Sequence, residues 1–290
     1  MKNSHNTLKS LAGVACLALL TGTAGAITAS LGDLVLGFRA SSPIGNDRNL
    51  EVNLGPVANY RGLAPNTTFI VSGLNVLDLV ATYGGSWDTR NDLTFGIVGA
   101  TGNATLVTPG GNLPARSLWA SRNEVAPGTT STPWTRGSAS NQQNSASAIE
   151  TMYGVSVGAL PQGSATANSG TATIIDSSLA GSWSVQEDAP NGTQSFRRWD
   201  STFRGTAGSI PSVGTFYDPL EGFAVLDVWE LLAGSPQQPG TLLGAFGLND
   251  NGQLVFSNSP GVFAPIPEPS TTLALAASGA ALLLRRRRRA

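Results

Sequence analysis

The chain is nearly devoid of the residues on which many enzymes and all disulfide-bonded domains depend. Among 290 residues there are one cysteine, one histidine and two lysines, and all four lie close to the N-terminus. They are Lys2, His5, Lys9 and Cys16. Beyond them, disulfides, Ser-His-Asp or Cys-His catalysis, lysine Schiff bases and zinc held by histidine or cysteine are all excluded. The remaining options for chemistry are paired carboxylates, tyrosine, or Ca²⁺ held by oxygen atoms.

Charge is scarce as well, at 12% of residues, about half the usual share of roughly 25%. This excludes a coiled coil and a charge-rich disordered chain. From the totals of 18 acidic and 17 basic side chains, we remove Glu268, both lysines and the five C-terminal arginines. That leaves 17 acidic and 10 basic, a balance of −7, and every remaining basic residue is arginine. An acidic segment without lysine offers no basic stripe, so nucleic-acid binding is not expected.

Residues 1–26 have the pattern of a secretory signal peptide. Two lysines give a positive start, and Leu11 to Leu20 is an uninterrupted run of apolar and small residues. Ala24 and Ala26 then frame a cleavage site of the small-x-small type. Ten residues rise only about 15 Å as a helix, too little to cross roughly 30 Å of hydrocarbon. The sequence therefore predicts export and removal of this segment.

The C-terminus combines three features in a fixed order. It begins with a short element of Pro267, Glu268, Pro269 and Ser270. An uncharged run from residue 271 to residue 284 follows, and the chain then closes with Arg285, Arg286, Arg287, Arg288, Arg289 and Ala290. Five consecutive arginines are costly to translocate and would stop the chain in the cytoplasm. The small residues of the run would let a transmembrane helix pack closely against a partner helix.

Together these features resemble the PEP-CTERM sorting signal of Gram-negative bacteria, a segment also labelled an ice-binding protein C-terminal domain. The resemblance spans residues 267–289, under a tenth of the chain. It implies that an exosortase-type membrane protease or transpeptidase recognises the tail and cleaves near its Pro-Glu-Pro element. The tail would anchor the protein transiently in the inner membrane. The body would then pass to the cell surface or the extracellular matrix.

Strand patterns dominate between the two ends. Leu34 to Phe38 and Leu50 to Leu54 alternate in hydrophobicity on either side of a turn-rich segment, which predicts a β-hairpin. Further strands are expected at residues 93–97, 171–175, 183–185, 223–232, 242–248 and 253–256. The last two flank an Asn-Gly pair, a strong signal for a tight turn.

Two short helices are also expected. Asn75 or Ser72 would cap the first, which ends at Tyr83 before Gly84, and the second covers residues 144–153. The stretches 100–143 and 158–170 are rich in Gly, Ser, Thr, Asn and Pro and predict long loops.

The expected fold is therefore mainly β. We predict a sandwich or jelly-roll-like body over residues 27–256, with one or two short helices covering an end. A linker at 257–266 would join this body to the sorting signal at 267–290, which contains a transmembrane helix at 271–284.

Candidate sites in the body are few. Asp227 and Glu230 are the most obvious carboxylate pair, but glycoside hydrolysis needs two carboxyl groups facing one sugar, roughly 5–9.5 Å apart. On the expected strand, residues three apart face opposite sides, which favours two solvent-facing acids. A diffuse Ca²⁺ site near Asp88 and Asp92 is the alternative for metal, although the sequence gives no clear metal ligand set.

Two of the six tryptophans, Trp119 and Trp134, lie in the polar middle of the chain and are candidates for stacking on sugar rings. Packing in the core or at an interface is the competing interpretation. Overall we expect a non-enzymatic surface or matrix protein without cofactor, which presents Ser, Thr, Asn and aromatic groups to exopolysaccharide or neighbouring proteins. The alternative is a carbohydrate-binding or carbohydrate-active body that uses carboxylates and tryptophan.

Overall fold

The computed structural model describes residues 29–41, 43–108, 111–124, 128–153, 167, 171–188, 214–215, 223–234, 237–259 and 263. The strands are β1 (Asp33–Ala40), β2 (Arg48–Pro56), β3 (Thr68–Val71), β4 (Leu93–Ala100), β5 (Leu118–Asn123), β6 (Ala172–Asp176), β7 (Gly214–Thr215), β8 (Ala224–Leu231), β9 (Thr241–Leu248) and β10 (Leu254–Ser257). The helices are α1 (Val76–Tyr83), α2 (Ala139–Met152) and α3 (Trp183–Asp188), with short 3-10 helices η1 (Val57–Asn59) and η2 (Trp87–Thr89).

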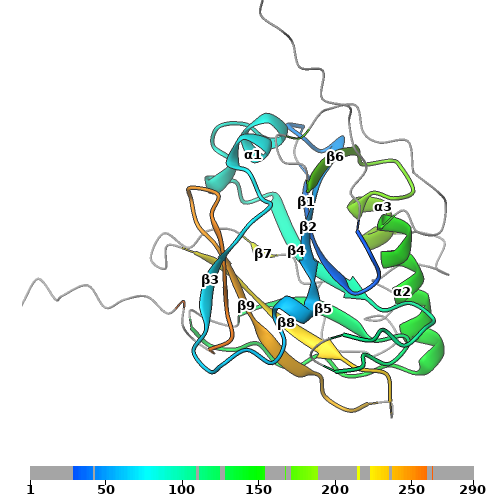
Figure 1. Cartoon of the computed structure of the whole chain (residues 1–290). Coiled ribbons are helices and arrows are strands. Elements are labelled where there is room, and N and C mark those ends of the chain that lie inside the picture. The colour runs from blue at the N-terminus through cyan, green and yellow to red at the C-terminus, as the bar shows by residue number, and fades with distance from the viewer. Residues whose placement is uncertain are drawn as a thin grey trace, which may run out of the picture.

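The strands form one curled sheet in the order β3-β10-β9-β8-β5-β4-β1-β2-β6, and β7 pairs with β4 (Figure 1). Neighbouring strands run antiparallel. The curl brings the two edges of the sheet together at one point, where the Thr171 hydroxyl donates to Gly73 O at 3.4 Å. The mainly β prediction is confirmed. The two facing layers of strands belong to one sheet, which wraps around its own core.

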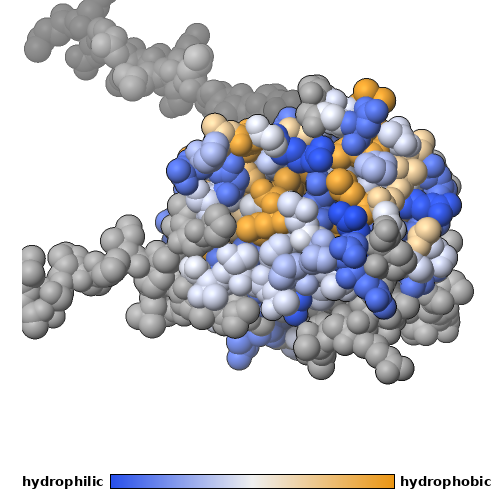
Figure 2. Space-filling view, turned by 90° about the horizontal axis from the view of Figure 1, so that it is seen from below, coloured by the Kyte–Doolittle hydropathy of each residue, from blue (hydrophilic) through white to orange (hydrophobic). Residues whose placement is uncertain are grey.

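The concave side of the sheet holds the main core. In β1, Leu34, Leu36 and Phe38 face it, in keeping with the predicted alternation. Helix α1 covers the upper end, where Leu79 and Tyr83 are buried in the same core. At the lower end, apolar side chains reach the surface and polar residues surround them, as Figure 2 shows.

The predicted cap of α1 is confirmed. Asn75 accepts a hydrogen bond from Leu77 N through its side chain, and Gly84, with φ at +90°, ends the helix. The Tyr83 hydroxyl at the end of α1 accepts from Leu50 N at 3.0 Å and donates to Phe38 O at 2.8 Å. It thereby bridges the main chains of β1 and β2.

A second layer covers the convex side. Helices α2 and α3 pack there against outward-facing residues such as Val35 of β1 and Val98 of β4. These strands are therefore buried on both faces. Helix α2 begins at Ala139, five residues before the predicted helix, because Ser138 caps it by accepting from Asn141 N.

Three further expectations differ from the structure. Residues 183–185 belong to helix α3 and not to a strand. Strand β5 lies within a stretch predicted to be loop. The expected linker starts inside β10, which runs to Ser257, and Phe263 is buried against the sheet.

Within the described part of the chain, no helix combines the length and apolar character needed to cross a membrane. The predicted signal peptide at 1–26 and transmembrane helix at 271–284 lie outside the described residues.

Candidate functional site

Helix α3 lies on the convex face of β1 and β2, where a tryptophan packs on bare backbone. Trp183 is fully buried, and a Cβ added at Gly37 would fall within its indole ring. Gly37 pairs across the sheet with Gly96 of β4, so two adjacent positions on this face carry no side chain. The indole ring occupies the space that a side chain at position 37 would fill. A larger residue at position 37 would displace it.

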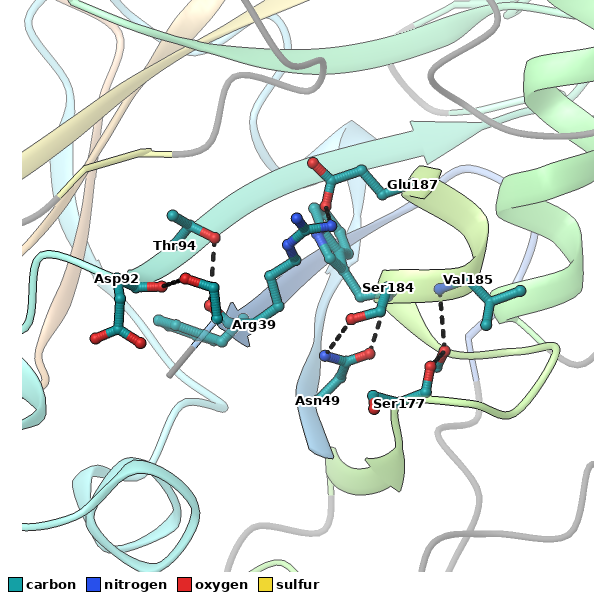
Figure 3. A network of polar contacts seen from close by, with 12 residues as sticks. Arg39, Asn49, Asp92, Thr94, Ser177, Ser184, Val185 and Glu187 are labelled. Carbon is teal, nitrogen blue, oxygen red and sulfur yellow. Dashed lines mark hydrogen bonds and ion pairs between the residues drawn. The ribbon is translucent and has the colours of Figure 1, made fainter. Parts of the chain in front are cut away.

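The first turn of α3 is capped by side chains of β2. Trp183 N donates to Glu51 Oε1 at 2.5 Å, and Ser184 N donates to Asn49 Oδ1 at 2.9 Å. The Asn49 amide in turn donates to Ser184 Oγ at 2.9 Å, as Figure 3 shows. The first N–H groups of a helix have no partner within the helix. Asn49 and Glu51 supply those partners and so hold α3 to the sheet.

Burial strongly perturbs the carboxyl group of Glu51. Its neighbours Leu50 and Val52 face the concave core, so Glu51 faces α3, and only 1% of it is exposed. Burial raises the pKa of Glu51 to about 8, against the opposing effect of the hydrogen bond from Trp183 N. The carboxyl group is therefore mostly neutral at pH 7 and retains a proton that it can donate.

An ion pair ties the other end of α3 to β1. Arg39 Nη1 lies 2.8 Å from Glu187 Oε2, and the side chain of Glu187 is 1% exposed while that of Arg39 is 28% exposed (Figure 3). A buried carboxylate without a partner would be strongly destabilising, so Arg39 is needed for α3 to dock. Chemically, the network contains a neutral carboxyl group and a paired carboxylate. Both are buried where they fasten a helix.

The candidate pair Asp227 and Glu230 lies on β8, and its members face opposite sides of the sheet. Asp227 Oδ2 accepts from Ser131 N at 2.5 Å on the convex side, and burial raises the pKa of Asp227. Glu230 Oε2 faces the core, where it accepts from Trp119 Nε1 at 3.1 Å and lies 2.7 Å from Arg61 Nε. Carboxyl groups on opposite faces of a sheet cannot flank one sugar, so this pair does not form a glycosidase site.

Neither tryptophan named as a candidate glycan contact presents an open ring. Trp119 is fully buried, and Trp134 is only 5% exposed. Trp134 Nε1 donates to Ser121 O at 3.1 Å, and the guanidinium carbon of Arg122 lies 4.2 Å from its ring centroid. Packing and a cation–π contact occupy these rings, which argues against sugar stacking at either position.

The acidic residues suggested for Ca²⁺ are not gathered around a common point. Asp92 forms a two-point pair with Arg90, at 3.0 Å to Nε and 2.7 Å to Nη2. Arg90 also donates from Nη1 to Tyr83 O and to Ile44 O, each at 2.8 Å, so it joins the end of α1 to the β1–β2 loop. Asp88 lies in η2. Across the described ranges, no three His, Cys, Asp or Glu side chains are grouped as metal ligands.

Sequence patterns did not single out Asn49, Glu51 or Glu187. The alternation in β2 predicts that Asn49 and Glu51 point outward, but it does not predict that a helix covers them. One usable signal was glycine inside two expected strands, because Gly37 and Gly96 each stand between two apolar neighbours. Adjacent glycines on one face of a sheet indicate close approach of another group.

The residues predicted for export and sorting lie outside the described residues. They are Ala24, Ala26, Pro267, Glu268, Pro269, Ser270, Arg285, Arg286, Arg287, Arg288 and Arg289. Comparison with protein families shows that residues 265–289 match the PEP-CTERM protein-sorting motif. Neither a curated protein nor a solved structure matches the chain.

The chain is thus an exported protein with a sorting segment at its C-terminus, and this segment fits a terminal anchor. More particularly, it carries a PEP-CTERM sorting domain, as the sequence resemblance implied. The motif implies that an exosortase processes the chain and that its destination is the cell surface or the extracellular space.

Proposed function

We propose that the protein is a structural or adhesive component of the cell surface or extracellular matrix, and that its body has no catalytic activity. The observation that carries the proposal is the sorting motif at 265–289, which begins two residues after Phe263, the last described residue of the body. In this scheme a Gram-negative cell exports the chain, and the apolar segment 271–284 anchors it transiently in the inner membrane. Exosortase then cuts near Pro267 to Pro269.

The commitment of buried acidic groups to internal contacts supports a passive body. Glu51 and Glu187 hold α3, and Glu230 pairs with Arg61 beneath the sheet. The perturbed carboxyl group of Asp227 accepts from the Ser131 main chain. Each of these acidic groups already has a structural role.

Exposed apolar side chains near α1 support adhesion. Leu77 and Val80 lie three residues apart on this helix and are 58% and 39% exposed. Ile44 is 61% exposed, and Arg90 ties its loop to the end of α1. Exposed apolar groups on a helix and on a loop tied to its end favour contact with other molecules.

The experiment uses the processed protein purified from the surface of its host. We expect no sugar release from a panel of exopolysaccharides, both for the wild type and for Glu51→Gln and Glu187→Gln variants. We also expect the double variant Leu77→Gln/Val80→Gln to be lost from the matrix fraction, whereas exposed Thr89→Gln is retained. Hydrolysis that disappears in either Glu→Gln variant would contradict the proposal and favour a carbohydrate-active body.

A further inference from the structure

Phe263 is held in a socket on the convex face of β8, β9 and β10. It is 5% exposed and packs with Val225 and Ala245. The ring of Phe223 lies beside it, with centroids 5.1 Å apart. Gly247 of β9 forms the floor of the socket, because a Cβ there would lie 2.8 Å from the Phe263 ring. The socket therefore fits an aromatic side chain and depends on a glycine.

Docking of Phe263 in the socket determines the length of the tether, which we define as the chain between the last residue held by the body and Pro267. Upstream of Phe263, the Ser259 hydroxyl donates to Asn66 Oδ1 at 2.7 Å, which fixes the chain beside the β2–β3 loop. With the ring in its socket, four residues lead from Phe263 to Pro267, and they reach at most about 14 Å. With the ring released, eight residues lead from Ser259 to Pro267 and reach at most about 28 Å.

We propose that Phe263 is a clasp that holds the sorting motif close to the folded body and thereby slows its processing. The proposal rests on exosortase processing of the tail as described above. A body of this size has a radius of gyration of about 17 Å, more than the docked tether can reach. While the ring is docked, the chain therefore cannot carry the Pro-Glu-Pro element more than about 14 Å from Phe263. Release of one side chain from the surface is a local motion that doubles the tether without unfolding the sheet.

Three variants of the full chain, expressed in the host, separate the effect of tether length on the rate of processing from the effect of tether sequence. Gly247→Ala should displace the Phe263 ring from the socket, and it leaves the linker sequence unchanged. Phe263→Ala removes the ring, and a Gly-Ser-Gly-Ser insertion after Ala264 lengthens the tether while the ring stays docked. We expect all three to raise the initial rate of tail removal several-fold in a pulse-chase experiment. Gly85→Ala is the matched control, because no atom lies within 4 Å of its added Cβ, and it should match the wild type.

Equal rates for the wild type, the Gly247→Ala variant and the insertion would overturn the clasp. Faster processing of Phe263→Ala alone would also overturn the clasp, because the protease would then recognise the Phe263 side chain itself. Limited proteolysis of the purified full chain gives a second test. The linker before the motif should be cut faster in Gly247→Ala, and an unchanged rate contradicts docking. A variant with alanine at Pro267, Glu268 and Pro269 separates the two proposals. Normal processing of that variant refutes recognition of the Pro-Glu-Pro element, whereas equal rates in the tether variants, with processing still dependent on that element, refute the clasp alone.

Discussion

Replacing Glu51 by glutamine should change the pH dependence of stability in a direction fixed by its burial. The pKa of this carboxyl group is raised from 4.5 to about 8 in the folded chain. At pH values between these two pKa values, Glu51 takes up a proton when the chain folds. Its contribution to the free energy of unfolding therefore falls by about 1.4 kcal/mol for each pH unit of increase. The favourable contribution is complete below pH 4.5 and is lost as the pH reaches about 8. Glutamine accepts the same hydrogen bond from Trp183 N but has no proton to lose.

The assay measures the free energy of unfolding of the wild type and of Glu51→Gln in urea at several pH values. Tryptophan fluorescence monitors the unfolding. Between about pH 5.5 and pH 7.5, the variant should gain about 3 kcal/mol relative to the wild type. Asp176→Asn is the control. This exposed carboxyl group has a lowered pKa because Ser178 donates to it, so its contribution is lost only at more acidic pH. Parallel pH profiles for the wild type and Glu51→Gln would refute the burial of Glu51 beneath α3.

Three further substitutions test other parts of the structure by urea unfolding. Tyr83→Phe removes the hydroxyl that bridges the main chains of β1 and β2 and should cost about 1–3 kcal/mol; a cost near zero would contradict the bridge. Gly37→Ala drives a methyl group into the indole above it and should cost about 1–3 kcal/mol, whereas Gly85→Ala should stay within about 0.5 kcal/mol of the wild type. Arg61→Met leaves the carboxylate of Glu230 buried without its cationic partner and should cost about 3–5 kcal/mol. Adding Glu230→Gln should restore part of that loss, and no recovery would count against the pair.

Much of the sheet is predictable because its strands carry their own pattern. The β1–β2 hairpin, β8 and the β9–β10 hairpin all follow from alternation and turn residues, and the Asn75 cap marks the start of α1. Strand β5 was missed because its apolar residues stand among small and polar ones that resemble a loop. The short run from Trp183 to Val185 fits a strand or a helix equally well. Capping by residues of β2, far away in sequence, decides in favour of the helix.

The polar network beneath α3 was beyond prediction for the same reason. Trp183 and Glu51 are 132 residues apart, and the Arg39–Glu187 pair spans 148. An outward-facing Glu51 on β2 predicts a solvated carboxylate unless the covering helix is known. The sorting tail was predictable because its three parts are contiguous. Phe263 was missed because the socket that buries it is formed by three strands of the sheet.

The central claim is that the tail directs sorting and is removed. The most direct test is the intact mass of the protein in fractions of its native host, for the wild type and for a variant with alanine at Pro267, Glu268 and Pro269. We expect the wild type at the cell surface or in the medium without residues 271–290, and the variant in the membrane with its full C-terminus. Retention of Arg285 to Arg289 in both forms would contradict the account and would leave a membrane protein anchored by its tail.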